Sequence, residues 1–352
     1  MIGTERPPAT WTGERRFRAA LDHEQPDRTP VWFMRQAGRC LADYRALRER
    51  YAILTLAKTP ELCAAVTLMP VAAFGVDAAV LFADIMLPLE PMGVSLEIQP
   101  DVGPIIHHPI RSASDVDALR LIEPEDEVGF VMDAVRLVRR ELDGRHAVIG
   151  FSGSPFTLAC YLVEGRPSRD YATAKAFMYR EPQAWDSLMD KLSTVVIRYL
   201  NAQVDAGVHV VQLFDSWVGA LSASDYEQYV QRHVARIFAE VRGAPTIHFG
   251  TGTAALLEAM AAAGGDVIGV DHRLPLDAAW ERVGFDRGIQ GNLDATRLLA
   301  GWEPAAAGAR DVLRRAANRP GHIFNLGHGV LPDTDPDLLR RMVDLVHAES
   351  AR

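Results

Sequence analysis

Short runs of apolar residues recur along the chain, and most are followed by a stretch with the 3.6-residue apolar period of a helix. Apolar and polar positions alternate little within the runs, which is typical of strands buried on both faces of a parallel sheet. The pattern predicts eight strands, at Thr29–Met34, Asp77–Phe82, His146–Phe151, Val208–Phe214, Pro245–Phe249, Asp266–Val270, Arg287–Gly291 and His322–Leu326.

Several of the segments between these strands carry signals for the ends of helices. Thr59 followed by Pro60 is typical of a helix start, and Gly75 of the corresponding end. Ser224 and Glu227 have the spacing of a capping box, which predicts a helix that continues through Val241.

Eight strands alternating with helices predict an α/β fold, a single (β/α)8 barrel of the TIM type. A doubly wound open sheet is the alternative by pattern alone. Within residues 88–126, Gly93–Ile98 and Pro104–Ile110 predict an inserted hairpin or loop excursion after the second strand. Residues 1–14 are expected to be a loose tail, and residues 15–352 a single barrel domain.

Composition narrows the class of protein further. The 352 residues are 48% apolar and carry a formal net charge of −9, with no Lys/Arg run longer than a pair, so nucleic-acid binding is not expected. No apolar run is long enough for a membrane span, and the N-terminus lacks the apolar stretch of a signal peptide. Three widely spaced cysteines, Cys40, Cys63 and Cys160, argue against a disulfide framework and favour a reducing cytoplasm.

Charged residues follow several predicted strands, at the barrel end where active sites lie. Arg35 and Arg39 follow the first strand and predict a clamp for carboxylates or phosphates, with an ordinary loop ion pair as the alternative. Asp84 ends an apolar strand, where a carboxylate needs a partner or a hydrogen-bond-donating ligand, unless it only caps a loop. His328 lies between two glycines that permit close approach of a ligand.

Motifs for cofactors and metals are incomplete. Gly150–Ser154 (GFSGS) lacks the last glycine of a nucleophile elbow, and Gly250–Gly252 lacks the third glycine of a dinucleotide loop. His107, His108 and His272 have no cysteine or second histidine at the usual metal-ligand spacings. The sequence therefore predicts neither a cofactor nor a metal site.

Two segments resemble the signatures of the uroporphyrinogen decarboxylase family: PVWFMRQAGR, which contains Arg35–Arg39, and GFSGSPFTLACYLVEG, Gly150–Gly165. Four further blocks match in the same order and extend the resemblance over nearly the whole chain beyond the tail: FADI (Phe82–Ile85), QLFDSWVG (Gln212–Gly219), QGNLD (Gln290–Asp294) and NLGHGVLPDT (Asn325–Thr334). Cys40 departs from the pattern, since many relatives have an aromatic residue there, but it removes no expected ligand.

The resemblance implies a cofactor-independent lyase of haem biosynthesis, which converts the four acetate arms of uroporphyrinogen III to methyl groups and releases coproporphyrinogen III and CO₂. It implies that Asp84 accepts hydrogen bonds from the pyrrole N–H groups and that Arg35 and Arg39 hold substrate carboxylates. It also implies a homodimer. The expected substrate-binding residues are Arg35, Gln36, Arg39, Asp84, Tyr161, Phe214, Ser216 and His328.

The absence of a cofactor has a chemical reason. Decarboxylation leaves an electron pair that needs a sink, and a pyrrole becomes one when the ring carbon bearing the acetate is protonated. Asp84 is then suited to stabilise the ring cation, and the two arginines to orient the acetates. Arg35, through a bound water, and His328 are both candidates for the proton donor.

Two other functions compete with this interpretation. A zinc- and corrinoid-dependent methyltransferase on the same fold needs a His/Cys zinc site at late strand ends, and no cysteine follows Cys160. A non-enzymatic tetrapyrrole carrier would have the same signature residues. The sequence also leaves open the order in which the acetates react and the preference for isomer I or III.

Overall fold

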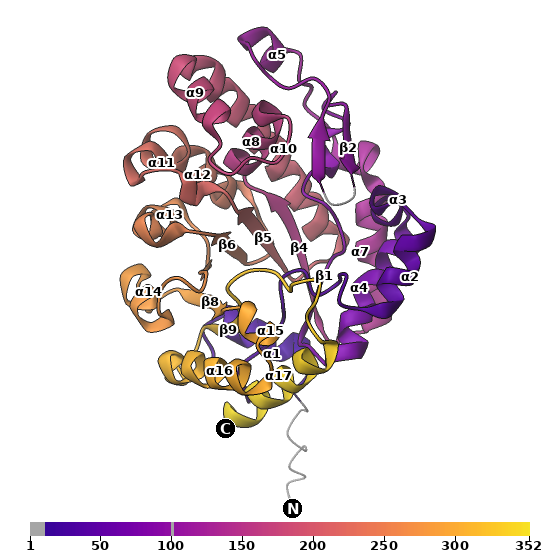
Figure 1. The fold of residues 1–352 in the computed structure, drawn as a ribbon, viewed down its shortest axis with the longest axis vertical. Coiled ribbons are helices and arrows are strands. Elements are labelled where there is room, and N and C mark those ends of the chain that lie inside the picture. Colours follow the sequence, from indigo (N-terminus) through magenta and orange to yellow (C-terminus); the bar gives the residue numbers. More distant parts are fainter. Residues whose placement is uncertain (1–10, 100–101) are drawn as a thin grey trace, which may run out of the picture.

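A computed structural model describes residues 11–99 and 102–352 of the chain. Its centre is a curled sheet of parallel strands in the order β1-β4-β5-β6-β7-β8-β9, with helices around its outer side (Figure 1). The seven strands are β1 (Ala78–Val80), β4 (Ala147–Gly153), β5 (Val210–Asp215), β6 (Thr246–Gly250), β7 (Val267–Gly269), β8 (Gly288–Leu293) and β9 (His322–Leu326).

Helices connect successive strands, as expected for a parallel sheet. The α-helices are α1 (Gly13–Leu21), α2 (Ala42–Arg50), α3 (Ile53–Lys58), α4 (Pro60–Phe74), α5 (Ala113–Asp117), α6 (Pro124–Glu127), α7 (Gly129–Leu142), α8 (Pro155–Glu164), α9 (Ala172–Arg180), α10 (Pro182–Ala206), α11 (Ala223–Tyr229), α12 (Gln231–Glu240), α13 (Leu257–Ala263), α14 (Leu276–Val283), α15 (Thr296–Leu299), α16 (Trp302–Ala316) and α17 (Pro336–Glu349). Short 3-10 turns are η1 (Leu87–Leu89), η2 (Val218–Ala220) and η3 (Thr253–Ala255).

Seven of the eight predicted strands are confirmed, and the first, Thr29–Met34, is wrong. This segment forms only an isolated bridge between Val31 and Phe324. Pro30 lacks the N–H needed for a regular ladder, and at Arg35 the chain turns with φ 57°. The segment still bonds to both neighbours, because Phe324 N donates to Pro30 O at 2.9 Å and Asp77 N to Val31 O at 2.8 Å.

Two other predicted regions are described only in part. Between η1 and α5, β2 (Leu96–Gln99) pairs antiparallel with β3 (Gly103–Ile106), and residues 100–101 between them lie outside the described residues. Of the predicted tail, residues 1–10 also lie outside the described residues. Helix α1 starts at Gly13, where the Thr12 side chain accepts a hydrogen bond from Arg15 N.

The predicted helix signals are correct at one site and misplaced at another. Helix α4 begins at Pro60 and ends at Phe74, and the next residue, Gly75, caps it with a φ of 71° that suits a glycine. The predicted capping box at Ser224 is wrong, because Ser222 caps the helix and accepts from Asp225 N at 3.1 Å. The helix also ends at Tyr229, and α12 follows as a separate piece.

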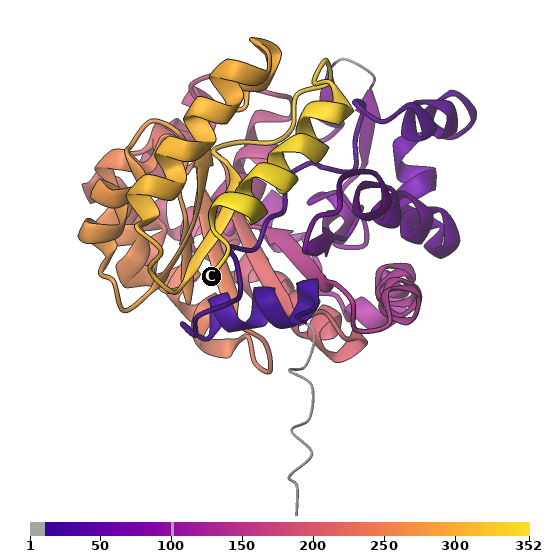
Figure 2. The same cartoon turned by 90° about the horizontal axis from the view of Figure 1, so that it is seen from below.

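A buried carboxylate joins helices α1 and α17. Asp77, just before β1, pairs with Arg16 of α1 and accepts from Val31 N at 2.7 Å. His347 of α17 contacts the same carboxylate at 2.8 Å. Helices α1 and α17 consequently lie on one side of the molecule (Figure 2). An ionised group is tolerated in the interior only when such partners surround it.

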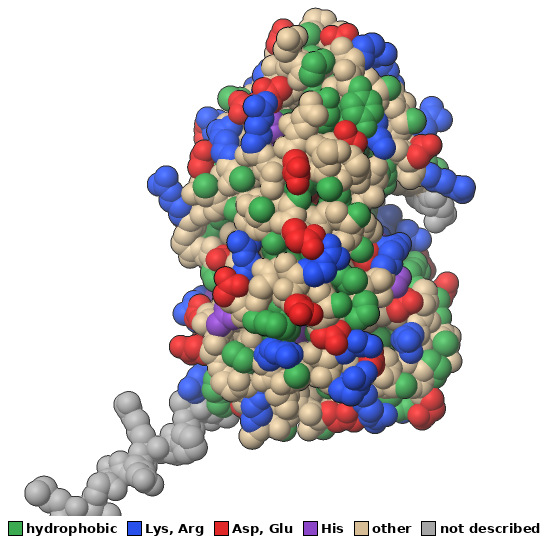
Figure 3. All heavy atoms as spheres, turned by 90° about the vertical axis from the view of Figure 1, so that its left-hand side faces the viewer, with side chains coloured by type: hydrophobic (Ala, Val, Ile, Leu, Met, Phe, Trp, Pro, Cys, Tyr) green, Lys and Arg blue, Asp and Glu red, His purple; other side chains and the backbone are tan. Residues whose placement is uncertain are grey.

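One face of the molecule shows a mixed distribution of charge. Acidic and basic side chains are interspersed over the face that carries α11, α13 and α14 (Figure 3). Within residues 11–99 and 102–352, no helix combines the length and apolarity needed to cross a membrane.

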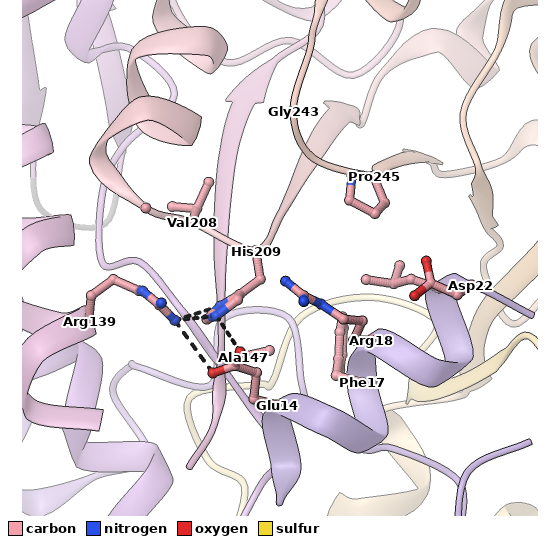
Figure 4. A pocket seen from close by; sticks show the side chains of 12 residues that line it. Glu14, Phe17, Arg18, Asp22, Arg139, Ala147, Val208, His209, Gly243 and Pro245 are labelled. Carbon is pink, nitrogen blue, oxygen red and sulfur yellow. Dashed lines mark hydrogen bonds and ion pairs between the residues drawn. The ribbon is translucent and has the colours of Figure 1, made fainter. Parts of the chain in front are cut away.

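The amino ends of the central strands surround a pocket of about 360 Å³ (Figure 4). His209, just before β5, accepts from Val148 N through Nδ1 at 2.7 Å, so its other ring nitrogen carries the proton. That Nε2 lies 3.1 Å from Glu14 of α1, and Arg139 of α7 contacts both residues. Burial lowers the pKa of His209 to about 4, and Arg139 adds to the effect. This neutral histidine links α1 to the sheet.

We predict that replacing Asp77 with alanine lowers the free energy of unfolding by about 3–5 kcal/mol, because Arg16 and Val31 N–H lose a buried partner. Urea denaturation measures the change. Asp344→Ala is the control, since the Asp344 side chain is 69% exposed beside Arg340 and its loss should cost less than about 1 kcal/mol. Equal effects of the two substitutions would contradict the role given to Asp77.

We also predict that acid weakens the fold through His209. Its pKa of about 4 in the folded chain lies below the unfolded value of about 6.5, so the unfolded state binds more protons between these pH values. The free energy of unfolding should therefore fall as the pH drops from about 6.5 to 4, by up to about 1.4 kcal/mol per pH unit for this group.

Denaturation curves at pH 7 and pH 5 test this link. His209→Gln keeps a side chain that can both accept and donate, and should reduce the difference between the two curves. His107→Gln, at an exposed position, should leave the difference unchanged. An unchanged difference in His209→Gln would exclude His209 as its source.

Candidate active site

The carboxyl ends of the strands lie at the end of the sheet opposite the pocket of Figure 4. Register places Gly153 beside Phe214 and Asp215 beside Gly250, and Leu293 lies beside Leu326 farther round the sheet. The segments that follow these strands therefore meet along one rim. Most of the polar residues predicted for the site belong to this rim.

Asp84 lies in the loop between β1 and η1 and is half-buried. Its Oδ1 accepts from Met86 N at 2.9 Å, and Leu87 N donates to the Asp84 carbonyl at 3.2 Å. This local turn fixes the direction of the carboxylate. Burial raises the pKa of Asp84, while the Met86 hydrogen bond and the positive charge of Arg35 lower it.

Arg35 is exposed and lies within electrostatic range of three other predicted site residues. Its charge lowers the pKa of Asp84, Tyr161 and His328 alike. In residues 11–99 and 102–352, no hydrogen bond or ion pair engages its guanidinium group. The structure thus brings Arg35, Asp84, Tyr161 and His328 together and leaves the cation available to a ligand.

The glycines around His328 make room for two neighbours. A Cβ on Gly329 would lie 2.5 Å from Cδ and 2.7 Å from Cγ of Arg35. A Cβ on Gly327 would lie 2.4 Å from the backbone nitrogen of His272. The predicted close approach at these glycines is therefore to protein, and Gly329 is what allows the Arg35 side chain to lie beside His328.

His328 itself is exposed. Desolvation by the surrounding protein lowers its pKa, and the charges of Arg35, His272 and Arg273 act in the same direction. Its imidazole is consequently neutral near pH 7. His272 and Arg273 lie in the loop after β7 and are not among the predicted site residues.

Tyr161, Phe214 and Ser216 come from neighbouring elements, α8, β5 and the loop after β5, and all three are half-buried. Phe214 meets Phe151 and Phe249 edge-on at centroid distances of 5.4 and 5.9 Å. Burial raises the pKa of Tyr161 well above its ordinary value, so its hydroxyl keeps its proton.

Gln36 is the predicted site residue that the structure places elsewhere. Its side chain is fully buried, accepts from Phe33 N at 3.0 Å and donates to Ala78 O at 3.0 Å. Its amide thus supports the turn that contains Arg35, whereas Arg39 is exposed. Spacing alone could not distinguish these two residues, because they share one short loop.

Comparisons of the whole chain with known proteins point to one family. The sequence model of the family described as "Uroporphyrinogen decarboxylase (URO-D)" matches residues 12–349. The chain is 56% identical over 335 residues to a uroporphyrinogen decarboxylase of Sorangium cellulosum, covering 95% of this chain and 96% of that one. It is 50% identical to the uroporphyrinogen decarboxylase of a Roseiflexus species, covering 96% of this chain and 99% of that one.

Among solved structures, a methyltransferase from Methanosarcina mazei aligns with a TM-score of 0.81, covering 97% of this chain and 99% of that one. At 20% sequence identity this likeness concerns the fold alone. The full-length family match and the high identity to decarboxylases decide between the two groups, and the chain belongs to the uroporphyrinogen decarboxylase family.

Proposed function

We propose that this chain removes the four acetate carboxyl groups of uroporphyrinogen III, giving coproporphyrinogen III and CO₂, and that Asp84, Arg35 and His328 carry the reaction. Membership of the family and about 50% identity to several curated decarboxylases over about 95% of the chain support the activity. It is a carboxy-lyase reaction of porphyrin biosynthesis. The observation that carries the residue assignment is the uncommitted cation of Arg35 beside the turn-held carboxylate of Asp84.

Substrate binding uses both signs of charge at the rim. Asp84 accepts hydrogen bonds from the pyrrole N–H groups, since Met86 N occupies only one of its oxygens. Arg35 and Arg39 hold acetate and propionate carboxylates, as exposed guanidinium groups do well. Phe214 packs against the macrocycle. Tyr161, Ser216 and His328 complete the polar lining, while Gln36 acts through the turn that contains Arg35.

The chemical step protonates the ring carbon next to the one that bears the acetate, because the latter must stay trigonal to accept electrons. The ring becomes a cation, the bond between the methylene and carboxylate carbons breaks, and its electron pair forms an exocyclic C=CH₂ bond that neutralises the ring as CO₂ leaves. A second proton converts the CH₂ to a methyl group, and the ring carbon loses its added proton, which restores the pyrrole. Ionised Asp84 stabilises the ring most strongly when the positive charge of the ring is greatest. An oriented anion lowers the energy barrier of the decarboxylation in this way.

The choice of proton donor follows from charge. His328 is neutral because of its lowered pKa, so it is a poor proton source and better suited to hydrogen-bond a carboxylate. Arg35 holds its own proton too tightly to act directly. We infer that a water molecule oriented by Arg35 delivers the proton.

The wider assignments are also ours. We infer that segment 29–34 takes the place of an eighth strand and closes a (β/α)8 barrel, with the β2–β3 hairpin inserted after β1; bonds to Asp77 and Phe324 support the closure. We propose one catalytic domain over residues 15–352 and a homodimer in the cytoplasm. Sizing chromatography and cell fractionation test the last two points.

We predict that Asp84→Asn lowers kcat by about 100-fold or more, because the neutral amide cannot offset a pyrrole cation. KM should change much less, since the amide oxygen still accepts from N–H groups. Rates of CO₂ release from uroporphyrinogen measure both constants, with Asp344→Asn as the control.

The pH profile gives a second test of Asp84. Wild-type kcat should fall as the pH drops through the raised pKa of Asp84, because only the ionised form is active. That acidic limb should be missing in Asp84→Asn. A near-wild-type rate in this variant would remove Asp84 from the mechanism.

We predict that Gly329→Ala lowers kcat/KM by about 10- to 100-fold, because the new methyl group would overlap Arg35 and displace its guanidinium. The thermal midpoint should change little, since Arg35 is exposed and can move. Gly129→Ala is the matched control, because a Cβ there would meet no atom within 4 Å. Full activity in Gly329→Ala would show that the position of Arg35 is unimportant.

A further inference from the structure

Tyr161 is held by an aromatic contact outside the predicted site. The ring of Trp217, in the loop after β5, lies 4.0 Å from the Tyr161 ring, centroid to centroid, with the planes at 41°. Trp217 also stacks on Tyr171 at 4.7 Å and 26°. Tyr171 is itself buried and precedes α9. Three rings from three separate segments therefore form one contiguous group.

Hydrogen bonds fix the loop that carries Trp217. Its backbone N–H donates to Thr157 Oγ1 at 3.4 Å, and that hydroxyl donates to the buried Asp215 carboxylate at 3.3 Å. Thr157 lies one helical turn before Tyr161 on α8, so the same helix contacts both the backbone and the ring of Trp217. On the other side of the loop, Thr251 Oγ1 donates to Ser216 O at 2.5 Å.

Close packing also prevents the loop from shifting. A Cβ on Gly219 would lie 2.2 Å from Thr251 O, so this part of the loop lies directly against the segment that follows β6. Lys175 of α9 donates to Ala220 O at 3.0 Å. Trp217 is thus a fixed surface for the Tyr161 ring, not a mobile cover.

The Tyr161 hydroxyl, in contrast, is not used by the protein. Within residues 11–99 and 102–352 it makes no hydrogen bond, although Asp84 and Arg35 both lie within electrostatic range of it. A half-buried phenol with a constrained ring and an uncommitted hydroxyl is suited to donate to a ligand.

We propose that Trp217 is a positioning residue, which sets the rate of decarboxylation by holding the Tyr161 ring so that its hydroxyl stays beside Asp84. The inference rests on the proposed role of Tyr161. Loss of the indole frees the Tyr161 ring to rotate about its side-chain bonds. The hydroxyl then spends less time in the reactive geometry, while the arginines that bind the substrate are unaffected.

A double-mutant cycle tests this inference. Trp217→Leu should lower kcat at least 10-fold, which is the loss typical of a misplaced catalytic group. KM should change less than 3-fold. Trp217→Phe should recover most of the rate, because a flat ring remains. In a Tyr161→Phe background, which has no hydroxyl to position, Trp217→Leu should lower kcat less than 2-fold further.

Controls separate positioning from folding. Trp302→Leu removes another half-buried tryptophan, which contacts Arg341 of α17, and should leave kcat unchanged. Circular dichroism and thermal midpoints show which variants fold. If Trp217→Leu does not fold, Tyr171→Leu replaces it, since it removes the ring behind Trp217 and should lower kcat in the same non-additive way.

The outcomes are distinguishable. If Trp217→Leu lowers kcat equally with and without the Tyr161 hydroxyl, the inference is overturned. It is also overturned if folded Trp217→Leu has a normal kcat while Tyr161→Phe is impaired. A wild-type rate in Tyr161→Phe would instead refute the role of Tyr161 and the inference with it, but would leave decarboxylation by the chain intact.

Discussion

The sheet depends on how its first and last strands are joined. Between β9 and β1 lies a segment that is not itself a strand, and the buried Asp77 carboxylate holds it by accepting from Val31 N. The same carboxylate binds Arg16 and His347, from the first and last helices. An anion in the interior needs such donors around it, so helices α1 and α17 must meet at this point.

The same segment leads to the active site. The segment contacts Asp77 through Val31 and reaches the rim at Arg35, a non-glycine residue with φ 57°. Such a conformation is unfavourable alone and persists because its surroundings fix it. Gln36 binds Phe33 N and Ala78 O, Met34 O accepts from Val330 N, and Gly329 makes room for the Arg35 side chain. RQAGR and NLGHG are therefore two halves of one structural unit.

This dependence explains what the sequence could predict. Apolar runs identified the strands from β1 onwards, because a strand that is buried on both faces is apolar along most of its length. Asp84 and Arg35 could be assigned to the rim from their place after apolar segments. The irregular segment 29–34 could not be predicted, since its conformation relies on contacts with distant residues such as Phe324 and Gly329. The buried position of the Gln36 amide could not be predicted either, because adjacent polar residues point in different directions, which only the fold determines.

Charge sets the final constraint on the site. The chain carries a net charge of −9, and Figure 3 shows both signs mixed over one face, so long-range attraction cannot gather a substrate with eight carboxylates. Binding must come from cations within about one Debye length, roughly 8–10 Å. In the proposed function Arg35 meets this need and a second one, because its charge opposes the burial that raises the pKa of Asp84. The proposal thus gives one cation two tasks, to attract the carboxylate that will leave and to favour the ionised form of Asp84, which is why the two residues must be positioned together.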